Sequence, residues 1–138
     1  MTLEVHLRFA GAGLIALALL HAVFPRYFDW SRELSRLSLI NRQMMQVHAF
    51  FIAVVVALIG VLAISSARLL VSTSLGHRVA AGIAVFWLLR LAIQWFGYST
   101  KLWRGKRFET IVHVVFTCVW TYLTVLFCAV WLSGQRIG

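Results

Sequence analysis

Three histidines stand close to the ends of apolar runs, where an imidazole can ligate a metal or move a proton. His21 lies four residues before Pro25, at the end of the first apolar run, and His48 lies just inside the second. His113 follows Glu109 by one helical turn near the start of the fourth run. Neutral imidazole is the commonest protein metal ligand, and histidine also titrates in the range that acid–base chemistry uses. These three residues are therefore the first candidates for a chemical centre.

The composition excludes a soluble domain. Of the 138 residues, 62% are hydrophobic and only 12% are charged, and the mean hydropathy is +0.88. Soluble chains carry about a quarter charged residues. The sequence therefore predicts an integral membrane protein.

Four apolar runs are long enough to be membrane spans, because a helix needs about 20 apolar residues to cross the hydrocarbon core. Backbone polar groups in lipid must be satisfied within the segment, which favours helices. The short strands of alternating polarity that are typical of a membrane barrel do not occur in the sequence. We therefore predict an all-α integral membrane protein, a four-transmembrane-helix bundle forming one domain over residues 1–138. The expected spans are approximately residues 3–24, 44–64, 79–98 and 109–132.

Between the first two spans, residues 29–41 predict a short amphipathic interfacial helix. Asp29 is a suitable N-cap residue. Trp30, Leu34 and Leu37 follow at steps of three and four, so they share one side, while arginines and serines fill much of the rest. Such a helix lies in the membrane interface with its apolar side toward the lipid.

The basic residues are distributed unevenly between the two ends of the spans. Loops one and three carry eight of them, namely Arg26, Arg32, Arg36, Arg42, Lys101, Arg104, Lys106 and Arg107. The opposite side carries Arg8, Arg68, Arg78 and Arg136. Short loops rich in lysine and arginine stay cytoplasmic, so we expect a multi-pass protein of a bacterial-type inner membrane with both termini outside. The net charge of +9 is explained by this bias, and we expect a lipid bilayer rather than nucleic acid as the partner.

This topology brings the histidines to one depth. Four helical residues span about 6 Å, so His21, His48 and His113 all lie at a similar level beneath the cytoplasmic surface. Gln94 reaches this level from the third span, and Arg90 shares its face one turn away. An arginine at depth costs at least ~2.5 kcal/mol on insertion scales, so Arg90 is expected to face a partner, water or a bound anion. Spacing does not fix the rotation of each helix.

The leading hypothesis is a histidine-ligated metal centre for redox chemistry or electron transfer. In one form, two of the histidines ligate a non-covalent haem b, since the chain has no CxxCH motif. In the other form, all three bind a first-row transition metal ion, with Glu109, Glu33 or Met44 nearby. The candidate cofactor-binding residues, including partners for haem propionates, are Arg26, Arg42, Arg90 and Gln94.

Two alternatives belong to other functional classes. The first is an acid–base enzyme or binding protein for a lipid or quinone-like substrate, with Glu33 and Glu109 as the candidate catalytic carboxylates. The second is an accessory subunit that packs against a membrane-protein partner or a second copy through small residues such as the AGAG of residues 10–13. Cys118 and Cys128 lie about 15 Å apart along one expected helix, too far for a disulfide, and are read as packing residues.

Overall fold

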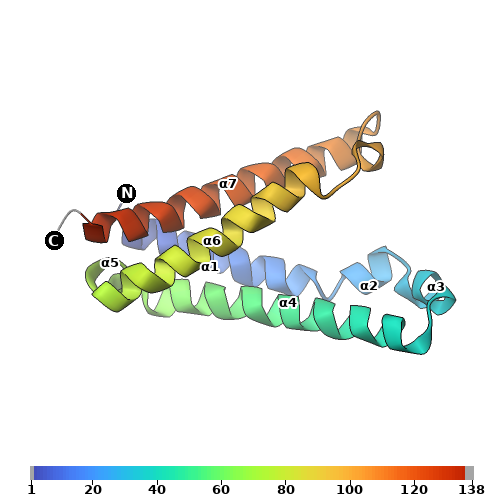
Figure 1. Cartoon of the computed structure of the whole chain (residues 1–138), viewed down its shortest axis with the longest axis horizontal. Helices are drawn as coiled ribbons and strands as arrows, with labels where there is room; N and C mark the ends of the chain where they lie inside the picture. Colours follow the sequence, from blue (N-terminus) through green and yellow to red (C-terminus); the bar gives the residue numbers. More distant parts are fainter. Residues whose placement is uncertain (1, 136–138) are drawn as a thin grey trace. The chain divides into compact units, whose positions relative to one another are not determined.

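The computed structural model describes residues 2–135, and within this range every element of secondary structure is helical. Four helices are long and apolar enough to cross a membrane, and they are coloured from blue to red along the chain in Figure 1. They are α1 (Leu3–Leu20), α4 (Leu39–Ser65), α6 (Ser74–Phe96) and α7 (Arg107–Gln135). The prediction of an all-helical protein with four long apolar helices is therefore confirmed. Arg136, which entered the charge comparison, lies outside the described residues.

The long helices begin and end at different residues from the predicted spans. α4 begins at Leu39 rather than near residue 44, since the helix includes the polar residues 41–43 that precede the apolar run. α1 ends at Leu20 and is followed by a turn. Pro25 then lies at the start of a short helix, α2 (Phe24–Tyr27), where its missing N–H is tolerated. Hydropathy thus locates the apolar part of a helix rather than its ends.

The segment predicted as one interfacial helix is divided in the structure. It forms α3 (Trp30–Glu33) and the 3₁₀ helix η1 (Leu34–Arg36), and Leu37 is then extended. Asp29 occupies the N-cap position of α3, but its carboxylate accepts the Ser31 hydroxyl at 3.0 Å instead of capping a backbone N–H. The Ser35 hydroxyl also bonds locally, donating to the Arg32 carbonyl at 2.6 Å. Such local bonds compete with regular helical hydrogen bonding.

The chain divides into two compact units, which are described separately. The N-terminal unit consists of residues 7–67. In it, α1 meets α4 at Gly11 and Gly60, where a Cβ added to Gly11 would lie 2.6 Å from the Gly60 carbonyl oxygen. Such small residues let apolar helices approach closely when lipid provides no hydrophobic effect between them.

The C-terminal unit consists of residues 68–135 together with residues 2–6. It contains α5 (Ala67–Ser72) from Arg68 onward, and α6 and α7 run side by side, joined by a loop that includes η2 (Thr100–Leu102) (Figure 1). Trp87 of α6 and Phe127 of α7 are fully buried. At the loop, the Thr110 hydroxyl donates to the Trp103 carbonyl at 2.7 Å, and Gly105 has a φ of 81°. The loop is therefore held against the first turns of α7.

Candidate functional site

Two neighbouring helices of the C-terminal unit connect Arg90, Gln94 and His113. α6 places Arg90 and Gln94 one turn apart, and Arg90 Nη1 donates to Gln94 Oε1 at 3.3 Å. Gln94 Nε2 lies 2.9 Å from His113 Nδ1 of α7. Gln94 is buried, with 6% of its surface exposed. The structure thus brings together Gln94 and His113, which the sequence had placed at one depth, and Arg90, one turn away.

The direction of these hydrogen bonds determines the tautomer of His113. A guanidinium group only donates, so Gln94 must turn its oxygen toward Arg90 and its NH₂ group toward His113. His113 Nδ1 therefore accepts a hydrogen bond. A neutral imidazole that accepts at Nδ1 carries its proton at Nε2. His113 consequently offers an N–H at Nε2 rather than a lone pair.

Aromatic rings surround this hydrogen-bonded chain. Trp103 stacks on His113 with ring centroids 4.5 Å apart, and Arg90 Cζ lies 4.8 Å from the Trp120 ring centroid and 5.7 Å from that of Tyr98. A cation over an indole or phenol face is stabilised by the ring quadrupole. The side chain of Arg90 is therefore held inside the helix pair by one hydrogen bond and two aromatic faces.

Two indole N–H groups in the same region have no hydrogen-bond partner among the described residues. Trp87 and Trp120 stack with centroids 5.2 Å apart, and both Nε1 atoms are buried. An unsatisfied buried donor costs about 1–3 kcal/mol. The sequence analysis did not single out Trp120, although its position two helical turns after His113 predicts a shared face.

His21 and His48 of the N-terminal unit are the opposite tautomer from His113. His21 Nδ1 lies 2.9 Å from the Leu17 carbonyl oxygen, and His48 Nδ1 lies 2.7 Å from that of Met44. A carbonyl oxygen only accepts, so Nδ1 carries the proton in both rings. In the neutral form, each Nε2 therefore presents a lone pair.

A cavity of about 370 Å³ lies within the N-terminal unit, beside His21. The lining is mostly apolar, and His21, Trp30 and Gln46 contribute its polar side-chain atoms. The lining residues are Ala18, Leu19, His21, Ala22, Pro25, Trp30, Gln46, Ala49, Phe50 and Ala53. His48 is exposed and does not belong to this set. The two histidines thus differ in their surroundings although their local hydrogen bonds match.

The other predicted site residues do not join either arrangement. Arg26, Glu33 and Glu109 are exposed, Arg42 is half-buried, and Met44 is 49% exposed. Within residues 2–135, no group of three or more His, Cys, Asp or Glu side chains is arranged to hold a metal ion. His21 and His48 belong to one unit and His113 to the other. A shared three-histidine centre stays a prediction.

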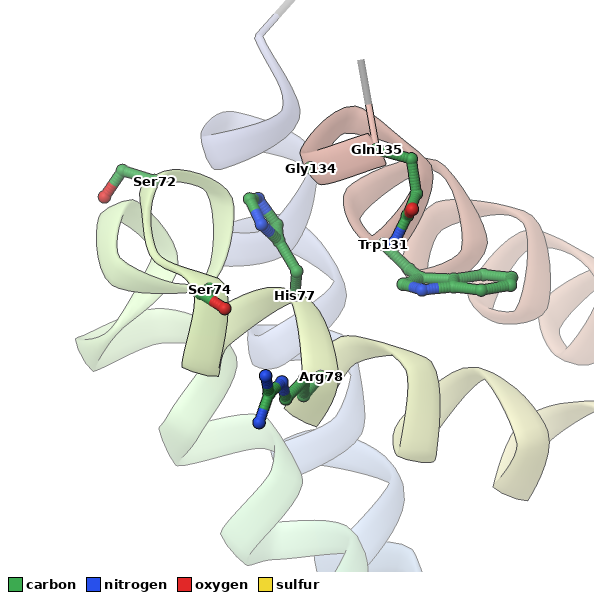
Figure 2. Close-up of a pocket in the computed structure, with 7 residues that line it drawn as sticks. All are labelled: Ser72, Ser74, His77, Arg78, Trp131, Gly134 and Gln135. Atoms are coloured by element: carbon green, nitrogen blue, oxygen red, sulfur yellow. The ribbon is translucent and has the colours of Figure 1, made fainter. Parts of the chain in front are cut away.

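A second cavity, of about 410 Å³, lies at the other end of the α6–α7 pair (Figure 2). Its lining includes Ser74, His77, Arg78, Trp131 and Gln135. His77 Nε2 donates to the Val71 carbonyl at 2.8 Å, and a Cβ on Gly134 would overlap the His77 ring. Figure 2 shows Arg78 directed away from Trp131, so the polar groups do not converge. We assign His77 a packing role.

The two sites differ in the hydrogen bonds they can make. The cavity beside His21 offers an acceptor, whereas the cluster between α6 and α7 offers mainly N–H donors. Comparison with protein-family models, curated proteins and solved structures gives no match to this chain. The function must therefore be argued from these two sites.

Proposed function

We propose that this is a multi-pass membrane protein that binds an amphipathic molecule of the lipid or quinone class in the cavity of its N-terminal unit. His21 Nε2 accepts a hydrogen bond from a hydroxyl group of the ligand. Four long apolar helices support the membrane location, and the cavity beside His21 supports the ligand class.

The proposed orientation follows from the basic loops. The excess of lysine and arginine in loops one and three supports a cytoplasmic position for these loops in a bacterial-type cell. Both termini then lie outside, and residues 30–36 lie near the inner-leaflet interface. A C-terminal reporter enzyme that works only outside the cytoplasm is expected to be active. Activity of a reporter that works only in the cytoplasm would reverse this topology.

The cavity is the single observation that carries the ligand proposal. Small-molecule sites are concave, mostly apolar and about 300–1,000 Å³ in volume, with a few polar groups that fix orientation. The cavity of about 370 Å³ has these properties. The cavity has room because four small residues line it. Ala18 and Ala22 come from α1 and the turn that follows it, and Ala49 and Ala53 come from α4. The apolar part of an amphipathic ligand can therefore be buried next to a histidine.

The state of the His21 ring specifies which ligand group it recognises. Because Nδ1 donates to Leu17, neutral His21 can only accept at Nε2. A quinol or a lipid alcohol provides the matching O–H donor, whereas a quinone provides only acceptors.

The two histidines of the N-terminal unit form a matched pair for the test. A hydroquinone with a ten-carbon tail would be titrated into detergent-purified wild-type protein, His21→Ala and His48→Ala, with binding measured by calorimetry. We expect His21→Ala to bind the hydroquinone about threefold to tenfold more weakly, because the variant loses one hydrogen bond to the ligand. His48→Ala should bind like wild type, because it keeps the cavity intact. Equal affinities in all three proteins would contradict the proposed role of His21.

A haem-binding function is the second candidate, and it is favoured because His21 and His48 are the same tautomer. Metal-ligating histidines commonly donate one ring N–H to a carbonyl and bind through the other nitrogen. Both rings have this arrangement, whereas Nδ1 of His113 is engaged by Gln94. A haem protein would show a visible absorption band that both His21→Ala and His48→Ala abolish. Purified protein reconstituted with haem that gives no such band would reject this candidate.

A further inference from the structure

We infer that the buried cluster between α6 and α7 binds the phosphate of an anionic lipid headgroup. The cluster consists of Trp87, Arg90 and Trp120. Gln94 and His113 continue the chain of hydrogen bonds from Arg90 and determine which groups donate and which accept. The inference is independent of the cavity in the N-terminal unit, which involves different residues and a different ligand group. Its physical basis is an excess of positive charge and N–H donors over acceptors.

The charge of Arg90 is not balanced within the cluster. Its hydrogen-bonded neighbour Gln94 is neutral, and its other contacts are the aromatic faces of Trp120 and Tyr98. The described part of the α6–α7 pair contains one acidic residue, Glu109, which is exposed. Glu109 precedes Trp120 by eleven residues, about 16 Å along the helix. Arg90 is partly buried, and a partly buried arginine without a carboxylate neighbour calls for an anion from outside the chain.

The indole groups add two more donors. Trp87 is 1% exposed and Trp120 is 5% exposed, and within the described chain neither Nε1 has an acceptor. An indole N–H can only donate. Buried polar groups in folded proteins nearly always have partners. These two groups therefore indicate that a bound acceptor completes the site.

The acceptors of the cluster are already engaged. Gln94 Oε1 receives a hydrogen bond from Arg90, and His113 Nδ1 receives one from Gln94. The cluster therefore suits a ligand group that accepts without donating, and an ionised phosphodiester is such a group. Because α6 and α7 are apolar helices long enough to span a membrane, we assign the phosphate to a lipid rather than to the solvent.

The indole N–H signals provide a direct test. Protein labelled with ¹⁵N-tryptophan in a zwitterionic detergent would be titrated with phosphatidylglycerol, phosphatidylcholine or inorganic phosphate. We expect phosphatidylglycerol alone to move the Trp87 and Trp120 indole protons downfield, because both N–H groups gain an anionic acceptor. The signal of Trp131, which lies at the far end of α7, should not move. Assignment would use Trp→Phe variants.

Two outcomes of this titration would overturn the inference. One is the absence of any shift at Trp87 and Trp120 with phosphatidylglycerol. The other is an equal shift with phosphatidylcholine or inorganic phosphate, which would remove the selectivity for an anionic lipid.

Variants with a matched control test the contribution of charge. Arg90→Gln is expected to weaken phosphatidylglycerol binding at least tenfold, and Arg78→Gln, an exposed arginine on the same helix, should leave it unchanged. Trp120→Phe keeps the ring stack, removes one donor and should weaken binding about threefold to tenfold. If Arg90→Gln does not fold, Trp120→Phe decides the question. Wild-type affinity in Trp120→Phe, or equal losses in Arg90→Gln and Arg78→Gln, would contradict the site.

Discussion

Replacement of Gln94 by leucine is expected to destabilise the α6–α7 pair by about 2–3 kcal/mol. Leucine removes the hydrogen bond to Arg90 and the one to His113, and both partners remain partly buried against the helix pair. Hydrogen bonds to charged groups contribute about 1.5–3 kcal/mol and neutral ones about 1 kcal/mol, with lower values common in membranes. Unfolding by increasing SDS in mixed micelles would measure the loss.

Gln135→Leu is the control for this substitution. Gln135 is exposed at the end of α7, and surface changes of this kind usually stay within about 0.5 kcal/mol. Similar unfolding curves for Gln94→Leu and Gln135→Leu would show that the buried amide does not hold Arg90 and His113.

Gln94→Glu keeps the contacts with Arg90 and His113 but reverses the direction of the hydrogen bond to His113. A carboxylate only accepts, so Glu at position 94 can receive hydrogen bonds from both Arg90 and His113. His113 should then carry its proton at Nδ1, whereas the wild-type ring carries it at Nε2. The new carboxylate also balances Arg90 and should abolish the response to phosphatidylglycerol. Histidine ¹⁵N shifts would report the tautomer, and an unchanged His113 tautomer in Gln94→Glu would contradict the assignment.

Substitution of Gly11 by valine is expected to cost about 3 kcal/mol in the N-terminal unit. A Cβ at Gly11 would lie 2.6 Å from the Gly60 carbonyl oxygen and 3.2 Å from the Ala63 Cβ. The backbone of α4 cannot yield as a flexible side chain would, so α1 and α4 must separate or distort. Overpacking of a tight interior typically costs about 1–3 kcal/mol, and a contact with backbone lies at the upper end.

Gly13→Val provides the comparison on the same helix. No atom lies within 4 Å of a Cβ added to Gly13, so valine there should be nearly neutral or slightly stabilising, because glycine is the poorer helix former. The two variants would be compared by SDS unfolding. Equal stability of Gly11→Val and Gly13→Val would mean that α1 and α4 do not approach closely at Gly11.

The helical content and the four long apolar helices could be predicted because they depend on composition along the chain. Uninterrupted apolar runs of about 20 residues favour helices over the alternating strands of a barrel, and this physical constraint needs no knowledge of tertiary contacts. The ends of the helices could not be predicted in the same way. α4 is helical through its polar residues Asn41, Arg42 and Gln43, which precede the apolar run, and the extended Leu37 interrupts a segment whose spacing favours a helix.

The site could be predicted only where residues share one helix or one depth. The one-turn separation of Arg90 and Gln94 predicts a shared face, and the depth argument brings His113 to the same level. Spacing does not give the rotation of a helix about its axis, and for this reason the different surroundings of His21 and His48 were not predicted. The tautomers of His21 and His113 also depend on neighbouring groups, the Leu17 carbonyl and the Gln94 amide respectively.

The unpaired indoles show a further limit of sequence reasoning. A tryptophan in an apolar helix is read as a packing or interface residue, since nothing in its neighbours states whether its N–H finds an acceptor. Only the structure shows that Trp87 and Trp120 are stacked and that both donors are buried. Their position beside Arg90 is the basis of the proposed anion site between α6 and α7.

The most direct test of ligand binding in the N-terminal unit is to fill its cavity. Ala49 lines the cavity, whereas Ala16 is exposed on α1, so Ala49→Phe and Ala16→Phe make the same change inside and outside it. Calorimetric titration with the ten-carbon hydroquinone should show wild-type affinity for Ala16→Phe and at least a tenfold loss for Ala49→Phe. Wild-type affinity in a folded Ala49→Phe protein would show that the ligand binds elsewhere and would contradict the proposed function.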